Sequence, residues 1–251
     1  MTDTPDPRGP RIVLVGTSHP GNIGSAARAM KTMGLERLVL VTPENFPHPE
    51  AFALSAGAND VLDAAQLCPD LAAALADCTL VIGTSARRRG VPLPELSPRE
   101  AAAQLARAHA NGERCALVFG RERTGLENEE LMLCHATVAI PANPHYSSLN
   151  LGAAVQVLAY EWRLAWLEVD AQGAAPEPPD GEPTATHAEM ELFHAHFGEL
   201  MDAIDFHKGR DPAIVGQRLR RLFAKARPDQ REVRILRGLF SDVQRLLRLR
   251  S

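Results

Sequence analysis

The 251-residue sequence has no apolar run that approaches the roughly 18 residues needed to cross a bilayer, so a membrane-spanning protein is not expected. Its first ten residues are polar and proline-rich, and they lack the apolar core of a secretory signal. Apolar residues make up 45% of the chain, which is enough to form a hydrophobic core. These features predict a globular protein of the cytoplasm.

Cysteine is scarce, and none of the four cysteines belongs to a Cys-x-x-Cys pair: Cys68, Cys78, Cys115 and Cys134. Only Cys134 has a second potential metal ligand beside it, His135, whereas a structural zinc site needs four ligands. We therefore expect reduced, buried thiols and no metal site.

The two common phosphate-binding fingerprints are also missing. The glycines of the first polar loop, Gly21 and Gly24, do not form a G-x-G-x-x-G pattern, and no P-loop lysine follows them. A nucleotide-dependent enzyme such as a dehydrogenase is therefore disfavoured.

Charge is unevenly distributed along the chain. The whole sequence has 27 Lys+Arg against 31 Asp+Glu, a net charge of −4, which by itself argues against nucleic-acid binding. Residues 207–251, however, contain 13 Lys+Arg and 4 Asp+Glu, a local charge of +9. The asymmetry favours a polyanion-binding module over a merely solvated surface. The candidate phosphate contacts in it are Arg218, Arg220, Arg221, Lys225 and Arg227.

Short runs of β-branched and aliphatic residues predict strands at 11–15, 38–41, 80–82, 116–119 and 137–140, with helical segments between them. This alternation is typical of an α/β protein with a parallel sheet, whose ligands bind at the carboxyl ends of the strands.

An apolar stripe predicts a long helix over residues 150–166. The proline- and glycine-rich residues 169–186 are expected to be a flexible linker, and three further stripes predict a small helical domain over residues 187–251.

Three loops at the expected strand ends contain unusual combinations of residues. The loop 19–28 supplies Asn22 and Arg28, the loop 119–125 places a charged run between two glycines, and the loop 140–150 is stiffened by two prolines. Tight turns and helix capping would explain each loop singly. Glycines that bracket a charged run directly after a buried strand indicate close approach of the backbone to a ligand.

Taken together, residues 17–34, 83–87, 119–131 and 143–151 resemble the signature motifs of the SPOUT superfamily, in its SpoU-like branch of 2′-O-ribose RNA methyltransferases. Within that branch, the resemblance is to tRNA methyltransferases that modify cytidine or uridine, and it extends to the basic helical tail. It covers residues 11–168 as a SPOUT methyltransferase domain and 187–251 as a basic, helical tRNA-binding domain.

The resemblance implies a fold with a deep C-terminal trefoil knot, a homodimer with its site near the subunit interface, and S-adenosyl-L-methionine as cofactor. By motif position, the residues implied to hold the cofactor are Thr84, Ser85, Ala86, Gly120, Ile140, Ser147, Ser148 and Leu149. Arg87 and Arg88, directly after the cofactor loop, are candidate phosphate contacts, with a solvated loop as the alternative.

The implied reaction is methyl transfer to a ribose 2′-hydroxyl at nucleotide 32 of the tRNA anticodon loop. Arg28 is the residue implied to act on the hydroxyl, either as a base or as a permanent cation that orients it and stabilises the developing alkoxide. We favour the second role because a guanidinium is essentially never neutral. Four further residues are implied to hold Arg28 and the ribose: Asn22, Glu122, Ser148 and Asn150. The alternatives are methylation of another RNA, such as rRNA, and a knotted RNA-binding protein without catalysis.

Overall fold

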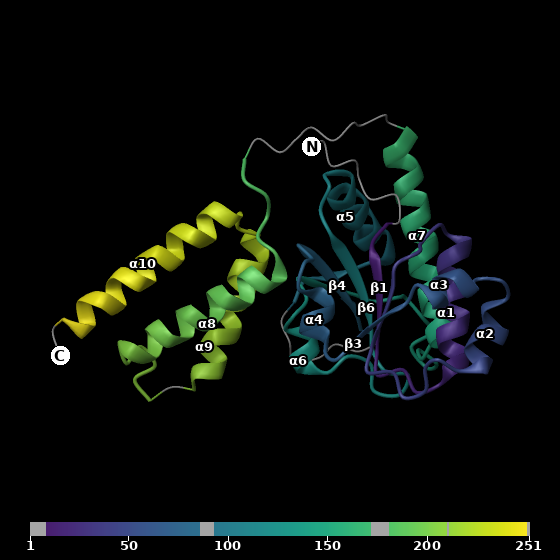
Figure 1. Ribbon diagram of the computed structural model, residues 1–251, viewed down its shortest axis with the longest axis horizontal. Coiled ribbons are helices and arrows are strands. Elements are labelled where there is room, and N and C mark those ends of the chain that lie inside the picture. Colours follow the sequence, from purple (N-terminus) through teal and green to yellow (C-terminus); the bar gives the residue numbers. More distant parts are fainter. Residues whose placement is uncertain (1–8, 86–92, 172–180, 210, 250–251) are drawn as a thin grey trace. The chain divides into compact units, whose positions relative to one another are not determined.

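A computed structural model of the chain describes residues 9–85, 93–171, 181–209 and 211–249. The chain forms two compact units, Met1–Pro178 and Pro179–Ser251. Figure 1 shows the first unit as a sheet flanked by helices and the second as a group of helices.

The first unit is built on a sheet of seven parallel strands in the order β3-β2-β1-β6-β4-β7-β5. All five strands predicted from the sequence are present, and the parallel α/β class is confirmed. The strands are β1 Arg11–Val15, β2 Leu38–Val41, β3 Gln66–Cys68, β4 Leu80–Thr84, β5 Glu95–Leu96, β6 Cys115–Phe119 and β7 Ala136–Val138.

Two strands, β3 and β5, were not expected from the sequence. They are three and two residues long and form the two edges of the sheet. Edge strands of this length have no long apolar run that could predict them. The strand predicted at 137–140 ends at Val138, so Ile140 lies in the loop beyond it.

Alternate residues of the strands face two separate cores. In β1, Ile12 and Leu14 belong to a core covered by α1, α5 and α7, with α2 and α3 packed on α1, whereas Val13 and Val15 face a core covered by α4 and α6. The helices of this unit are α1 Pro20–Thr32, α2 Pro49–Ser55, α3 Asn59–Asp63, α4 Leu71–Leu75, α5 Pro98–Ala110, α6 Asn128–Leu131 and α7 Leu151–Ala171. Figure 1 shows α1 and α7 on the side of the sheet opposite α4 and α6.

Two helices differ in how well their ends follow from the sequence. A capping box starts α5, since Ser97 Oγ accepts from Glu100 N at 3.3 Å and Ser97 N donates to Glu100 Oε2 at 2.8 Å; the order Ser-Pro-Arg-Glu in the sequence is typical of such a start. The long helix α7 begins one residue after its predicted start and continues to Ala171. It runs past residue 169, where the linker is expected to begin, because Val169 still packs against the core.

The four cysteines are free and buried, as predicted. Burial raises the pKa of Cys78 to about 11 and that of Cys134 to about 12, so both thiols are protonated at neutral pH.

Among the described residues, no helix is long and apolar enough to span a membrane, and no group of three or more potential metal ligands lies together.

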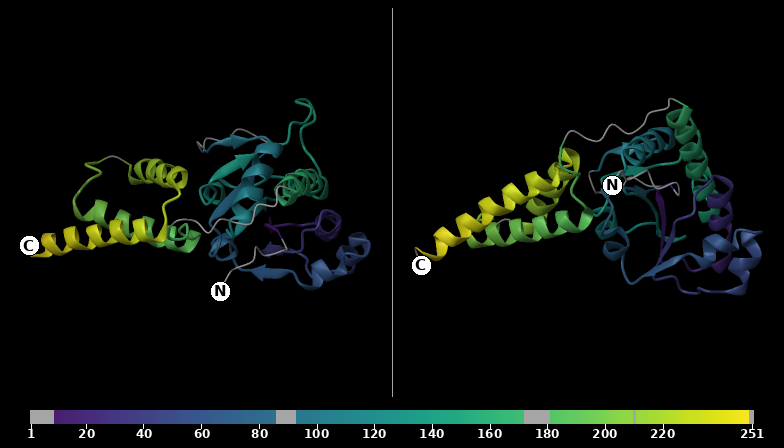
Figure 2. Two further views of the ribbon diagram at one scale, coloured as in Figure 1. Left: turned by 90° about the horizontal axis from the view of Figure 1, so that it is seen from above. Right: turned by 45° about the horizontal axis from the view of Figure 1, so that its top comes forward.

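In its described residues, the second unit contains α8 His187–Ala203, α9 Pro212–Ala226 and α10 Gln230–Arg248. An aromatic cluster forms its core: the rings of Phe193 and Phe223 are 4.6 Å apart, and those of Phe197 and Phe240 are 4.8 Å apart. Figure 2 shows α8 and α10 side by side over most of their length. Part of each predicted apolar stripe packs into this core, although Phe223 is the one described residue that α9 contributes to it. Three residues of the stripes, Ile204, Leu222 and Leu239, are exposed instead.

A half-buried ion pair lies beside this aromatic core. The Arg220 guanidinium contacts the Glu191 carboxylate through both nitrogens, with Nη2 2.9 Å from Oε2. Burial, together with the positive charge of Arg220, lowers the pKa of His194 to about 4. Burial also lowers the pKa of His187. Both histidines are therefore neutral in the folded unit at pH 7.

This burial makes the second unit sensitive to acid. Between pH 6.5 and 4 the unfolded chain binds a proton at residue 194 that the folded unit does not, so the free energy of unfolding should fall as the pH drops, by up to roughly 1.4 kcal/mol per pH unit. His194→Gln should flatten this slope, whereas His145→Gln, at an exposed position in the first unit, should leave it unchanged. Urea unfolding followed by helical circular dichroism at several pH values measures the slope. A His194 ring that titrates near pH 6.5 by NMR would contradict the argument.

Candidate functional site

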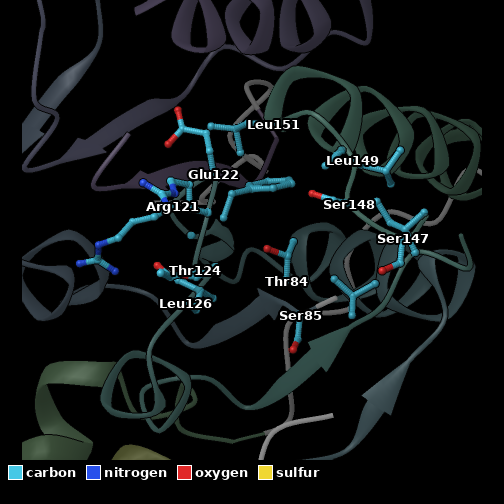
Figure 3. A pocket seen from close by; sticks show the side chains of 17 residues that line it. Thr84, Ser85, Arg121, Glu122, Thr124, Leu126, Ser147, Ser148, Leu149 and Leu151 are labelled. Carbon is cyan, nitrogen blue, oxygen red and sulfur yellow. Dashed lines mark hydrogen bonds between the residues drawn. The ribbon is translucent and has the colours of Figure 1, made fainter. Parts of the chain in front are cut away.

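The principal pocket of the first unit lies at the carboxyl ends of β6, β4 and β7, three adjacent strands. This is the edge at which a parallel sheet is expected to bind its ligand. The pocket contains about 980 Å³ of space not filled by protein atoms, part of which is open solvent. Figure 3 shows the side chains of Thr84 at the end of β4, Glu122 after β6 and Ser148 before α7 around this pocket.

The structure brings together most of the residues predicted to hold a cofactor. Seven of the eight line the pocket, and Ala86 lies outside the described residues, as do Arg87 and Arg88. The seven are Thr84, Ser85, Gly120, Ile140, Ser147, Ser148 and Leu149. Hydroxyl groups and aliphatic side chains therefore share the pocket, as an adenosine-like ligand with a polar sugar and an apolar ring requires.

Close backbone packing shapes one wall of the pocket, the hairpin from Gly120 to Gly125. Arg121 and Gly125 pair across it, with Gly125 N donating to Arg121 O at 2.8 Å. A Cβ on Gly120 would lie 2.1 Å from Gly125 C, and Gly125 itself has φ +69°. Both positions therefore require glycine, and the two glycines that bracket the charged run have a structural explanation.

The Glu122 carboxylate connects this hairpin to the loop between β1 and α1. Its Oε2 accepts from Ser18 N and from Ser18 Oγ, both at 3.2 Å, and its Oε1 accepts from His19 N at 3.3 Å and from Asn22 Nδ2 at 2.9 Å. Four donors thus surround two oxygens, which is the full accepting capacity of a carboxylate.

Those donors also set the ionisation of Glu122. Partial burial raises its pKa, but the hydrogen bonds from Asn22, Ser18 and His19 outweigh burial, and the net pKa is lowered. Glu122 is therefore a carboxylate at neutral pH and acts as an acceptor that orders the surrounding donors. This role differs from that of a proton-transfer group.

A second link extends from Asn22 to the third loop. Asn150 Nδ2 donates to Asn22 Oδ1 at 2.8 Å, while Asn150 Oδ1 accepts from Gly152 N at 2.9 Å in the first turn of α7. Each amide is oriented by its partners, since the Asn22 Nδ2 group must face Glu122. Three of the predicted residues, Glu122, Asn22 and Asn150, therefore form one directional chain of hydrogen bonds that joins the three loops.

Arg28 lies apart from this chain. It is exposed on α1, two turns after Asn22, and it is not among the residues that line the pocket. Its guanidinium has no hydrogen bond or ion pair with the described residues, although its backbone oxygen accepts from Thr32 Oγ1 at 2.7 Å. Ser148, the fifth predicted residue, lines the pocket.

Sequence reasoning missed two residues that hold the site together. Ser18 supplies two of the four bonds to Glu122, and Arg121 donates to both oxygens of Glu130 at 3.0 and 3.1 Å. Both lie inside the motifs, but a serine or an arginine in a loop gives no indication of its partner. Only the fold shows that Arg121 links the pocket hairpin to α6.

The predicted RNA-contacting residues of the second unit are in different environments. Arg218, Arg221 and Lys225 are exposed on α9. Arg220 differs from the expectation of a free cation, because Glu191 already neutralises it. Arg227 is the C-cap of α9 in the left-handed conformation, with φ +46°.

The chain of hydrogen bonds predicts a specific loss of stability. In Glu122→Gln, an NH₂ group replaces one acceptor and faces donors, so the free energy of unfolding of the first unit should fall by roughly 1–3 kcal/mol. Glu129→Gln, an exposed change on α6, should have no measurable effect. Urea unfolding followed by tryptophan fluorescence reports on this unit, since Trp162 and Trp166 both lie in α7. Equal midpoints for the two variants would exclude the proposed importance of the carboxylate.

Comparison with known proteins identifies the family. Residues 9–160 match the SpoU rRNA Methylase family, and residues 188–251 match the C-terminal domain of the tRNA methyltransferase TrmJ. The tRNA (cytidine/uridine-2′-O-)-methyltransferase TrmJ of Yersinia pestis is 50% identical over 235 residues, which cover 94% of this chain and 91% of the relative. The tRNA (cytidine/uridine/adenosine-2′-O-)-methyltransferase TrmJ of Pseudomonas aeruginosa is 50% identical over 246 residues and covers 95% of both chains.

A solved structure agrees with these matches. The crystal structure of TrmJ from Z. mobilis ZM4 superposes with a TM-score of 0.80 at 35% identity, covering 94% of this chain and 99% of that one. The chain therefore belongs to the SpoU rRNA methylase family and, within it, to the TrmJ methyltransferases.

Proposed function

We propose that this chain is an S-adenosylmethionine-dependent tRNA (cytidine/uridine-2′-O-)-methyltransferase that modifies the ribose of nucleotide 32 in the anticodon loop. The observation that carries the proposal is the pocket, where seven residues assigned to the cofactor by motif meet at the carboxyl edge of the sheet. The TrmJ relatives, which match this chain over nearly its whole length, support the tRNA substrate.

The residues of the pocket suit S-adenosylmethionine. Leu126, Val138, Ile140 and Leu149 supply an apolar wall for the adenine, and the hydroxyls of Thr84, Ser85, Ser147 and Ser148 can bond to ring nitrogens and ribose oxygens. Gly120 and Gly125 add backbone atoms to the pocket lining. When bound, the cofactor supplies a methyl group on a sulfonium, which is already electrophilic.

The protein therefore needs chiefly to align the 2′-hydroxyl and to stabilise charge on its oxygen. Alignment of this kind can contribute roughly 7–11 kcal/mol to lowering a barrier. In this proposal Glu122, Asn22 and Asn150 are positioning residues, because their polar atoms are occupied by one another and by backbone. They keep the three loops in the arrangement that the reactants require.

Arg28 is proposed to orient the 2′-hydroxyl and to stabilise the developing alkoxide as a permanent cation, with a phosphate or water taking the proton. Arg28 is exposed, and its guanidinium forms no hydrogen bond or ion pair with the described residues, so it is available for this role. Arg28 is not part of the pocket lining of its own chain, and we propose that the bound RNA or a second copy of the chain completes its surroundings.

The second unit is proposed to bind the tRNA backbone. The local charge of +9 over residues 207–251 and the match to the TrmJ C-terminal domain both support this assignment. Of its predicted contacts, the exposed Arg218, Arg221 and Lys225 are those available to phosphates, whereas Arg220 primarily holds α9 to α8.

Several properties of the family are proposed for this chain on the same basis. They are a homodimer with the site near the subunit interface, a deep trefoil knot in the C-terminal part of the sheet domain, and function in the cytoplasm without a metal. The division into a methyltransferase domain, a linker and a helical domain over residues 187–251 is also proposed, with the linker beginning after the end of α7 at Ala171 and not at residue 169.

The activity is tested by mapping methyl transfer. Purified protein with methyl-labelled S-adenosylmethionine should label the ribose of nucleotide 32 in tRNA transcripts that carry cytidine or uridine there. A transcript with adenosine at position 32 tests the wider range of the Pseudomonas relative. Label confined to rRNA, label on a base, or no transfer to any tRNA would each exclude the proposal.

Arg28→Ala should lose roughly 10²–10³-fold in kcat and keep its affinity for the cofactor. Arg107→Gln, an exposed change on α5, is the control.

The tRNA-binding role of the second unit makes a separate prediction. Replacing Arg218, Arg221 and Lys225 together by Gln should weaken tRNA binding and reduce the slope of log Kd against log salt by about one for each phosphate that is no longer bound. Cofactor affinity, measured by calorimetry, should not change. Arg220 is left intact because its removal would strand Glu191 and destabilise the unit. Unchanged tRNA affinity in the triple variant would refute the assignment of these residues.

A further inference from the structure

The pocket hairpin carries two arginines that differ in their partners. Arg121 is committed to the fold: its guanidinium donates to Glu130 at 3.0 Å and lies 3.6 Å from Glu127. Arg123, two residues later, also lines the pocket, is exposed, and has no hydrogen bond or ion pair with the described residues. The motif therefore provides one structural arginine and one arginine without a visible partner.

Among the described residues, no acidic group at the pocket forms an ion pair with Arg123. The carboxylate of Glu122, its neighbour, already accepts four hydrogen bonds from Ser18, His19 and Asn22. Among the described lining residues, the ionisable side chains are Arg121, Glu122 and Arg123. Arg121 is paired with Glu130, and both oxygens of Glu122 are hydrogen-bonded to the loop between β1 and α1. Among these three described side chains, Arg123 is therefore the one whose charged group has no bonded partner.

The backbone that carries Arg123 is tightly held. The hairpin is closed by the pairing of Arg121 with Gly125 and packed so closely at Gly120 that no side chain fits there. Glu122 binds the adjacent loop on one side of Arg123. A cation on a fixed turn loses less conformational freedom on binding a ligand than one on a mobile loop, which favours a binding role over a merely solvated charge.

We propose that Arg123 binds an anionic group of a reactant held in this pocket: either the carboxylate of the cofactor's methionine moiety or the phosphate next to the methylated ribose. Both are oxyanions that a guanidinium can bind through two parallel hydrogen bonds. The inference rests on the proposed function, since it takes the two reactants from there. It adds a residue that contacts a reactant to the positioning residues described above.

Arg123→Gln separates the two sources by calorimetry and kinetics. If the partner is the carboxylate, affinity for S-adenosylmethionine should fall roughly 10–100-fold, while affinity for 5′-methylthioadenosine, which has no carboxylate, should stay the same. If the partner is the phosphate, both affinities should be unchanged, KM for tRNA should rise, and the slope of log Kd against log salt should fall by about one.

Two further variants control the experiment. Arg123→Lys keeps the charge without the fork geometry and should recover part of the lost binding, and Arg107→Gln removes an exposed arginine outside the pocket and should behave as wild type. If Arg123→Gln matches wild type in cofactor affinity, KM for tRNA and salt slope, the proposal is overturned. The cofactor titrations need no transfer to tRNA, so a failure of the proposed function is seen separately in the wild-type methylation assay.

Discussion

The arrangement of the site depends on one ionised carboxylate that accepts four hydrogen bonds. Glu122 links the hairpin after β6 to Ser18, His19 and Asn22 of the loop after β1, and Asn22 passes the constraint on to Asn150 at the start of α7. A few side chains thus fix the positions of three loops from distant parts of the sequence relative to one another. The surrounding glycines and hydroxyls can line a pocket only because those loops are held.

Much of the fold could be predicted from the sequence because its strands are buried on both faces. Continuous apolar runs such as 38–41 and 116–119 are unambiguous signals of such strands. The edge strands β3 and β5 could not be predicted, since pairing with one neighbour needs only two or three residues and no apolar pattern. The end of β7 was placed too late because Ile140 is apolar yet lies in the loop that lines the pocket.

The residues of the site could be predicted from the sequence, but their hydrogen-bond and ion-pair partners could be predicted only in part. Motif resemblance selected Asn22, Glu122 and Asn150, and the structure shows that they bond to one another. The partners of the arginines were not predictable, because pairing depends on how the chain folds: Arg121 contacts Glu130 after the turn of the hairpin, and Arg220 contacts Glu191 on another helix. A count of basic residues in the sequence therefore predicts the sign of a surface's charge. It does not predict how many of those residues are free to contact a ligand.

The burial of all four cysteines has a practical consequence for experiments on this protein. Thiols whose pKa is raised by burial, such as those of Cys78 and Cys134, react slowly with maleimides at neutral pH. A cysteine introduced at an exposed position, such as Arg107 on α5 or Arg248 on α10, should therefore be labelled selectively without first removing the native thiols. A pair of such labels, one in each unit, would report in solution on how the distance between the units changes when tRNA is added.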